Sequence, residues 1–159
     1  TADMYLCLLE FARSVMTELS VTRDLIVGFP GETYEVFLDT VKLIEKAQYT
    51  SLYTFIFSPR EGTRAAKMDD PVSREEKGKW FSELCAAQEK IAAVRTSAMV
   101  GREYRVLCES KAKKDGYISG RTQGNIIIEF PADESVIGSF RTVRVTDALI
   151  WMLTGELAD

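Results

Sequence analysis

The residues best placed to do chemistry lie in two turns, each following an apolar stretch. The first turn is in "DLIVGFPGETYE", where Gly28 and Gly31 would allow a ligand to approach the backbone closely and a helix start would offer free N–H groups. In the second, "SPREGT", Arg60 could donate a pair of hydrogen bonds to a carboxylate or a phosphate. The glycines could equally serve the turn geometry alone, and Arg60 could be a solvated loop residue.

Side chains that commonly hold metals are scarce. The 159 residues include no histidine, the commonest general base and metal ligand. The three cysteines, Cys7, Cys85 and Cys108, are too widely spaced for a local metal motif or a disulfide framework. We therefore nominate no metal site and no catalytic residue, and any chemistry would rest on carboxylates, lysines or a cofactor.

A second candidate surface lies in the C-terminal part of the sequence. The formal net charge is −4, yet residues 102–128 hold six basic and three acidic residues. Such a segment could follow the phosphates of single-stranded RNA, with an amide adding a base contact. The alternative is a solvated lysine-rich hairpin at "KAKKDG". The predicted RNA-binding residues are Arg102, Arg105, Lys111, Lys113, Lys114, Arg121 and Asn125.

The first turn is expected at the edge of a strand–helix–strand unit. The run Leu25–Val27 is typical of a strand buried on both faces of a parallel sheet, and "SLYTFIFSP" predicts a second strand after a helix that fades near Gln48. A right-handed crossover makes the two strands parallel, so both turns should emerge at one edge. Flanking helices are predicted from Asp3 to Glu18 and from a capping box at Ser73 to just before Gly101.

After Gly101 the pattern changes to five short strand-like segments: "YRVLCES", "YISGRT", "NIIIEF", "GSFRTVRVTDAL" and "WMLTGEL". They predict a small closed barrel, and we expect Trp80 and Trp151 to lie in the cores. The two parallel strands leave unpaired edges, which favours a larger sheet or self-association. No apolar run is long enough for a membrane span, and we expect a cytoplasmic protein without membrane contact.

The motifs "DLIVGFPGET", "YTFIFSPREGTRAAKM", "SGRTQGNIIIEFPADESVIG" and "VTDALIWMLTGEL" together resemble the radical S-adenosylmethionine methylthiotransferases, and the tRNA-modifying branch most closely. The resemblance covers essentially the whole chain. It implies an α/β part, residues 1–100, from the C-terminal portion of a radical-SAM partial (β/α)6 barrel. An all-β part, residues 101–159, would be a five-stranded antiparallel TRAM β-barrel that binds RNA.

The resemblance also implies an activity for the full-length enzyme. A [4Fe–4S] cluster would cleave S-adenosylmethionine, and a methylthio group would be added at C2 of the isopentenylated adenosine beside the anticodon of tRNA. The predicted cofactor-binding residues, which would wall the S-adenosylmethionine pocket, are Gly28, Phe29, Pro30, Gly31, Glu32 and Arg60.

The cluster-binding CxxxCxxC motif is absent from this chain, so we expect the fragment alone to be inactive, with no cofactor bound. Its expected partners are the tRNA anticodon stem-loop and a missing N-terminal part of the same enzyme. The alternatives are a methylthiotransferase of a ribosomal protein and an RNA-binding module without chemistry.

Overall fold

The computed structural model describes residues 1–16 and 18–158, which divide into two compact units. The N-terminal unit comprises residues 1–16 and Val21–Ile91, and the C-terminal unit comprises Glu18–Ser20 and residues 92–158. Over the residues that the structure describes, no helix combines the length and the apolarity needed to cross a bilayer. Each unit is described below by itself.

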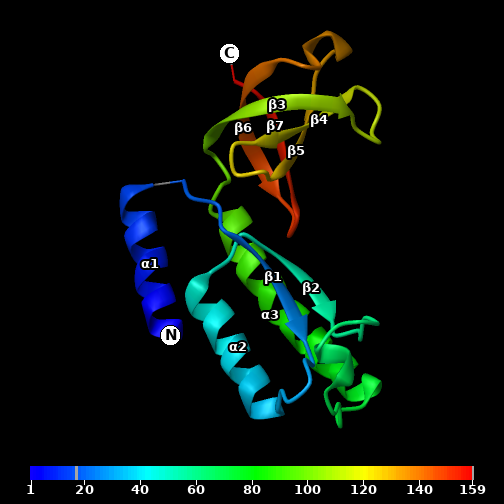
Figure 1. Cartoon of the computed structure of the whole chain (residues 1–159). Helices are drawn as coiled ribbons and strands as arrows, with labels where there is room; N and C mark the ends of the chain where they lie inside the picture. Colours follow the sequence, from blue (N-terminus) through cyan, green and yellow to red (C-terminus); the bar gives the residue numbers. More distant parts are fainter. Residues whose placement is uncertain (17, 159) are drawn as a thin grey trace. The chain divides into compact units, whose positions relative to one another are not determined.

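The N-terminal unit contains the predicted strand–helix–strand arrangement (Figure 1). Strands β1 and β2 are parallel, with Thr22 opposite Ser51 and Val27 opposite Ile56. The first helix ends at Val15, short of the predicted Glu18. The elements are α1 (Ala2–Val15), β1 (Thr22–Val27), α2 (Tyr34–Ala47), β2 (Ser51–Ile56), the short 3-10 helix η1 (Ala65–Lys67) and α3 (Arg74–Ser97), whose last turns belong to the second unit.

Side-chain caps fix where the helices begin. The Thr33 hydroxyl accepts from the Val36 N–H at 3.4 Å at the start of α2, and the Ser73 hydroxyl accepts from the Glu76 N–H at 3.2 Å at the start of α3. The predicted start at Ser73 is therefore confirmed. At the other end of α2, Gln48 adopts a left-handed conformation that closes the helix.

Strand β1 is buried on one face only, so the prediction of burial on both faces was wrong. Val27 is 2% exposed and joins the core formed by α2, α3 and Tyr49, whereas Ile26 is 55% exposed. Ile26 lies opposite Phe55, and Tyr53 is exposed on the same side of β2. The described helices supply a cover for the Val27 face alone, which leaves an apolar sheet face open.

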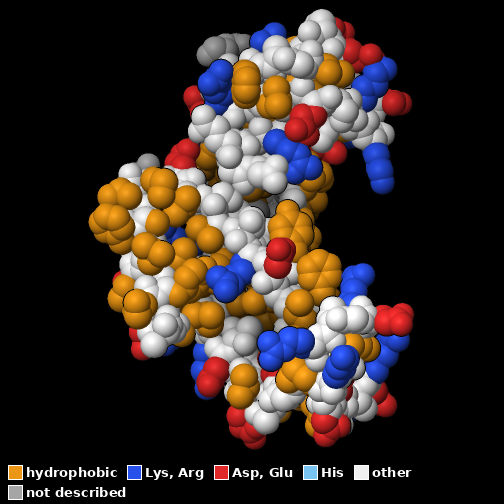
Figure 2. All heavy atoms as spheres, viewed as in Figure 1, with side chains coloured by type: hydrophobic (Ala, Val, Ile, Leu, Met, Phe, Trp, Pro, Cys, Tyr) orange, Lys and Arg blue, Asp and Glu red, His pale blue; other side chains and the backbone are white. Residues whose placement is uncertain are grey.

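Helix α1 carries a second exposed apolar surface. Met4, Leu8, Phe11 and Val15 recur at helical spacing, and each is between 62% and 71% exposed. Figure 2 shows hydrophobic side chains gathered over this helix. The opposite side of α1 contributes Leu9 to the core of the unit. Apolar residues on two sides are typical of a helix that packs against more than one neighbour.

The C-terminal unit is a closed barrel in the order β3-β4-β5-β7-β6 (Figure 1). The five predicted strands are confirmed, but the all-antiparallel arrangement is wrong, because β5 and β7 are parallel. A closed ring with an odd number of strands cannot alternate direction at every pair, so one parallel pair is unavoidable. The elements are β3 (Glu103–Lys111), β4 (Tyr117–Thr122), β5 (Ile127–Pro131), the short 3-10 helix η2 (Glu134–Val136), β6 (Phe140–Ala148) and β7 (Met152–Leu157).

Inward-facing apolar residues fill this barrel. Val106, Ile128 and Phe130 are completely buried, and the backbone passes so closely at Gly120 that a Cβ there would lie 2.5 Å from the Leu107 carbonyl oxygen. Trp151 is 50% exposed at the tip between β6 and β7, so its predicted core position was wrong, whereas Trp80 in the first unit is buried as predicted.

Candidate functional site

The turn after β1 is closed by its own hydrogen bonds. The Gly28 N–H donates to Glu32 Oε2 at 2.5 Å, and the Glu32 N–H donates to the Phe29 carbonyl at 2.8 Å. Gly28 and Gly31 have φ values of +73° and +90°, which other residues adopt only with strain. Phe29 contacts Phe57 edge-on, with ring centroids 5.3 Å apart. The backbone conformation at both positions therefore favours glycine.

Lys77 supports this turn from α3, and sequence reasoning did not nominate it. Its side chain is 4% exposed, and Nζ donates to both carboxylate oxygens of Asp70 at 2.5 and 2.6 Å. A Cβ on Gly28 would lie 2.4 Å from Lys77 Cδ, so the lysine stem fills the space beside that glycine. The apolar stripe of Trp80 and Leu84, extended by one helical turn toward the N-terminus, reaches residue 77. This helical spacing is the sequence signal that could have identified Lys77.

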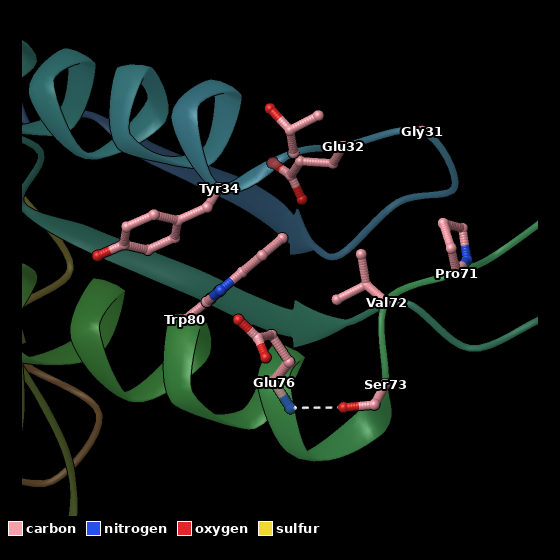
Figure 3. A pocket seen from close by; sticks show the side chains of 9 residues that line it. Gly31, Glu32, Tyr34, Pro71, Val72, Ser73, Glu76 and Trp80 are labelled. Carbon is pink, nitrogen blue, oxygen red and sulfur yellow. Dashed lines mark hydrogen bonds between the residues drawn. The ribbon is translucent and has the colours of Figure 1, made fainter.

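A surface pocket of about 510 Å³ opens where the starts of α2 and α3 meet (Figure 3). It brings Gly31 and Glu32 together with the aromatic rings of Tyr34 and Trp80, whose centroids are 5.8 Å apart. The Tyr34 hydroxyl donates to Glu83, and this hydrogen bond raises the pKa of Tyr34. The full lining is Gly31, Glu32, Thr33, Tyr34, Pro71, Val72, Ser73, Glu76 and Trp80.

The other predicted cofactor residues do not line this pocket. Pro30 and Gly28 are buried, Phe29 is 44% exposed, and Arg60 is exposed in the loop after β2, where its carbonyl accepts from the Thr63 N–H and hydroxyl. At Gly31 no atom lies within 4 Å of the position a Cβ would take, so a ligand could approach the backbone there. At Gly28 the same space is already occupied by Lys77.

The cysteines do not form a site for an iron–sulfur cluster. Cys7 is exposed on α1, Cys85 is half-buried on α3, and Cys108 is buried inside the barrel. Among residues 1–16 and 18–158, no three histidine, cysteine, aspartate or glutamate side chains gather as metal ligands would. These residues therefore do not fit a [4Fe–4S] cluster, which needs several converging thiolates.

In the barrel, two of the predicted RNA-binding residues are joined directly. Arg121 Nη1 donates to Asn125 Oδ1 at 3.1 Å, and its Nε donates to Glu109 at 3.1 Å. Asn125 has a φ of +63° in the turn between β4 and β5, so its side chain and its backbone carbonyl both face Arg121. Arg121 is thus already paired with a carboxylate.

Carboxylates from inside and outside the basic segment lie beside the lysine-rich hairpin. Lys111 forms an ion pair with Glu134, and Asp115 and Asp133 line the same shallow pocket of about 200 Å³. Hydrogen bonds from Ser135 lower the pKa of Asp133. Lys114 Nζ lies 3.8 Å from the centroid of the Tyr117 ring, and Lys113 is exposed.

A different cluster lies on β3 and β6. The Arg105 guanidinium carbon is 4.1 Å from the centroid of the Phe140 ring, and that ring is 49% exposed. Arg144 donates to Glu103 at 2.7 Å, and Arg102 and Arg141 are exposed. The sequence reasoning missed Phe140, although it alternates with the inward-facing Val143 and Val145 and so had to face outward.

The family model of the TRAM domain matches residues 97–158, which include the whole barrel. The barrel is a TRAM domain. The chain as a whole is similar to three proteins named tRNA-2-methylthio-N(6)-dimethylallyladenosine synthase. They come from Symbiobacterium thermophilum (42% identity over 98% of this chain), Moorella thermoacetica (41% over 100%) and Geobacillus thermodenitrificans (40% over 100%).

This chain covers 33%, 36% and 31% of those relatives, so it spans about a third of their length, and it corresponds to their C-terminal part, with the TRAM domain included. The similarity also extends through the N-terminal unit, because it covers 98% to 100% of the chain. The resemblance to the tRNA-modifying methylthiotransferases is thereby confirmed.

Proposed function

We propose that this chain is the C-terminal portion of a tRNA-modifying methylthiotransferase. The full enzyme would add a methylthio group at C2 of the isopentenylated adenosine next to the anticodon, using S-adenosylmethionine and [4Fe–4S] clusters. The observation that carries the proposal is the similarity to synthases of that name over 98% of the chain at 42% identity. It includes both units, so it supports more than a free-standing RNA-binding barrel.

In this proposal the N-terminal unit completes a radical-SAM barrel. The turn of Gly28 to Glu32, with Arg60 from the loop after β2, would form part of the S-adenosylmethionine pocket wall. Parallel strands β1 and β2 end at the same edge, which supports this assignment, as does the open space at Gly31. The clusters would be held by an N-terminal part of the enzyme, because the described cysteines do not converge.

The TRAM domain would hold the tRNA anticodon stem-loop. Its support is the group of exposed cations at Arg102, Arg105 and Lys113, together with the Arg121–Asn125 pair. A tRNA substrate, rather than a ribosomal protein, is supported by the names of the relatives, which specify tRNA. The predicted boundary at Gly101 is kept as part of this proposal.

A chimaera tests the proposal directly. The C-terminal third of the Symbiobacterium thermophilum synthase is replaced by this chain and expressed in bacteria that lack their own synthase, and methylthiolated adenosine is measured in digested tRNA by mass spectrometry. We expect the modification to be restored. A matched chimaera that ends before residue 97, and so lacks the TRAM domain, should restore much less. A stable, cluster-loaded chimaera that forms no methylthio product would overturn the proposal.

A further inference from the structure

The outer surface of the barrel carries an unusual combination of side chains across β6, β3 and β4. Phe140 lies opposite Leu107, and Leu107 lies opposite Arg121, so the three form one row across adjacent strands. With strands about 4.8 Å apart, the row is about 10 Å wide. Arg105 lies over the Phe140 ring at its end. We call these four residues, Arg105, Leu107, Arg121 and Phe140, the Arg105 patch.

Arg105 differs from the ion-paired cations of the barrel in its partner. Arg121 pairs with Glu109, Arg144 with Glu103, and Lys111 with Glu134. Within the described part of the chain, no carboxylate pairs with Arg105, whose contact is the Phe140 ring at 4.1 Å. Its positive charge is therefore not paired with a carboxylate and lies against an aromatic ring.

The Phe140 ring is a half-exposed apolar group on the outer surface of the barrel. Outward positions on a small barrel face water, and the neighbouring outward residues Thr142 and Arg144 are polar. A guanidinium stacked on an aromatic ring is planar and is itself a surface for further stacking. The arrangement therefore offers a planar cationic platform, flanked by Arg121, instead of a plain charged surface.

We propose that the Arg105 patch binds one unpaired nucleotide of RNA, with the base stacked on the Arg105–Phe140 pair and a flanking phosphate contacted by Arg121. Single-stranded nucleic acid presents both planar bases and regularly spaced negative charges, and the proposed function makes RNA the ligand. The lysine-rich hairpin is a weaker candidate, because Lys111 is paired with Glu134, and Asp115 and Asp133 line the same pocket as Lys111 and Lys114. This inference rests on the proposed RNA-binding role of the TRAM domain and assigns it to one surface.

The test titrates a fluorescent ten-nucleotide RNA without secondary structure into the complete 159-residue chain at several salt concentrations. Phe140→Leu keeps an apolar side chain and removes the ring, and we expect its affinity to fall by about 5- to 100-fold at an unchanged salt slope. Phe140→Tyr should bind as the unaltered chain does. Arg105→Ala should also weaken binding, because it removes the guanidinium that forms the stacking surface with Phe140.

A second cation–ring pair in the same barrel provides the matched control. Lys114 lies 3.8 Å from the Tyr117 centroid, so Lys114→Ala and Tyr117→Leu remove the same kind of contact from the hairpin. We expect both to change affinity by less than about 2-fold, since stacking on a base is lost only at the Arg105 patch. Circular dichroism and thermal unfolding of every variant establish that the barrel is folded.

The outcomes separate this inference from the proposed function. Binding by the unaltered chain that is lost in the hairpin variants and kept in Phe140→Leu and Arg105→Ala would overturn the Arg105 patch and leave RNA binding by the TRAM domain intact. No binding by the folded, unaltered chain at low salt would overturn both. Selective loss in the two Arg105-patch variants, with Phe140→Tyr unaffected, would support the inference.

Discussion

Replacing Asp70 by asparagine should destabilise the N-terminal unit more than replacing its partner Lys77 by methionine. The Lys77 side chain is 4% exposed and that of Asp70 is 32% exposed. Asp70→Asn leaves a buried ammonium group without a counter-charge, whereas Lys77→Met leaves a carboxylate that water can reach. Removing one partner of a fully buried pair costs about 3–5 kcal/mol. Partial exposure on the Asp70 side reduces this cost, so we expect about 2–3 kcal/mol for Asp70→Asn.

The cost of Lys77→Met should be about 1 kcal/mol. Methionine keeps an unbranched apolar stem against Gly28, where the lysine methylenes now fill the space. It loses the cation that lies 5.4 Å from the Phe57 ring centroid, a contact worth about 0.5–1 kcal/mol. The control is Lys79→Met, two residues along α3, because Lys79 pairs with Glu75 through side chains that are 68% and 83% exposed. Exposed helical pairs of this kind contribute only about 0.3–0.5 kcal/mol.

Urea unfolding measured by tryptophan fluorescence can separate these values. The variants are made in a Trp151→Phe background, so that Trp80, buried against Phe37, reports on the N-terminal unit alone. The midpoint and the slope give the free energy of unfolding. If Asp70→Asn costs no more than Lys79→Met, or less than Lys77→Met, the burial of an uncompensated ammonium group does not control the stability of this turn.

Three further outcomes are expected. Thiol labelling of the folded chain should proceed first at the exposed Cys7 and last at Cys108, where burial raises the pKa of the thiol; equal rates would contradict the closed barrel. Burial and the hydrogen bond to Tyr5 raise the pKa of Tyr49, so the N-terminal unit should lose stability as the pH rises above about 10, and a Tyr49→Phe variant that loses as much would refute this. Anaerobic reconstitution with iron and sulfide should yield no stoichiometric [4Fe–4S] absorbance, and a stable cluster would show that the three cysteines can converge.

Local signals predicted much of the fold. Ser73 caps α3 as its capping box indicated, and the strand–helix–strand order follows from the change between strand-like and helical periods. The five segments after Gly101 correspond to five strands because each is bounded by turn residues. Each of these features depends on residues that are close together in the sequence, which is the range over which a sequence pattern is informative.

Features that depend on residues far apart in sequence were not predictable in this way. Residues 102–128 contain more basic than acidic side chains. The fold, however, places Asp133 and Glu134, which follow this segment in the sequence, beside the lysines of the hairpin. Burial of β1 on both faces would have needed a second layer, which the described elements do not supply. Trp151 follows "TDALI" in a strand-like run, but the chain reverses direction between β6 and β7 at this point. The Trp151 ring is therefore exposed to solvent.

The two units expose surfaces that respond to salt in opposite ways. On the N-terminal unit, the Met4–Val15 stripe of α1 and the Ile26–Phe55 face of the sheet are apolar, and within the described residues β1 and β2 pair only with each other. Covering them, by another copy of the chain or by the rest of a synthase, would bury apolar surface, and excluded salts such as sulfate strengthen that burial. Binding of RNA to the barrel would weaken with salt through counterion release. Association that grows with sulfate while RNA affinity falls would therefore assign the two interactions to different units of the same chain.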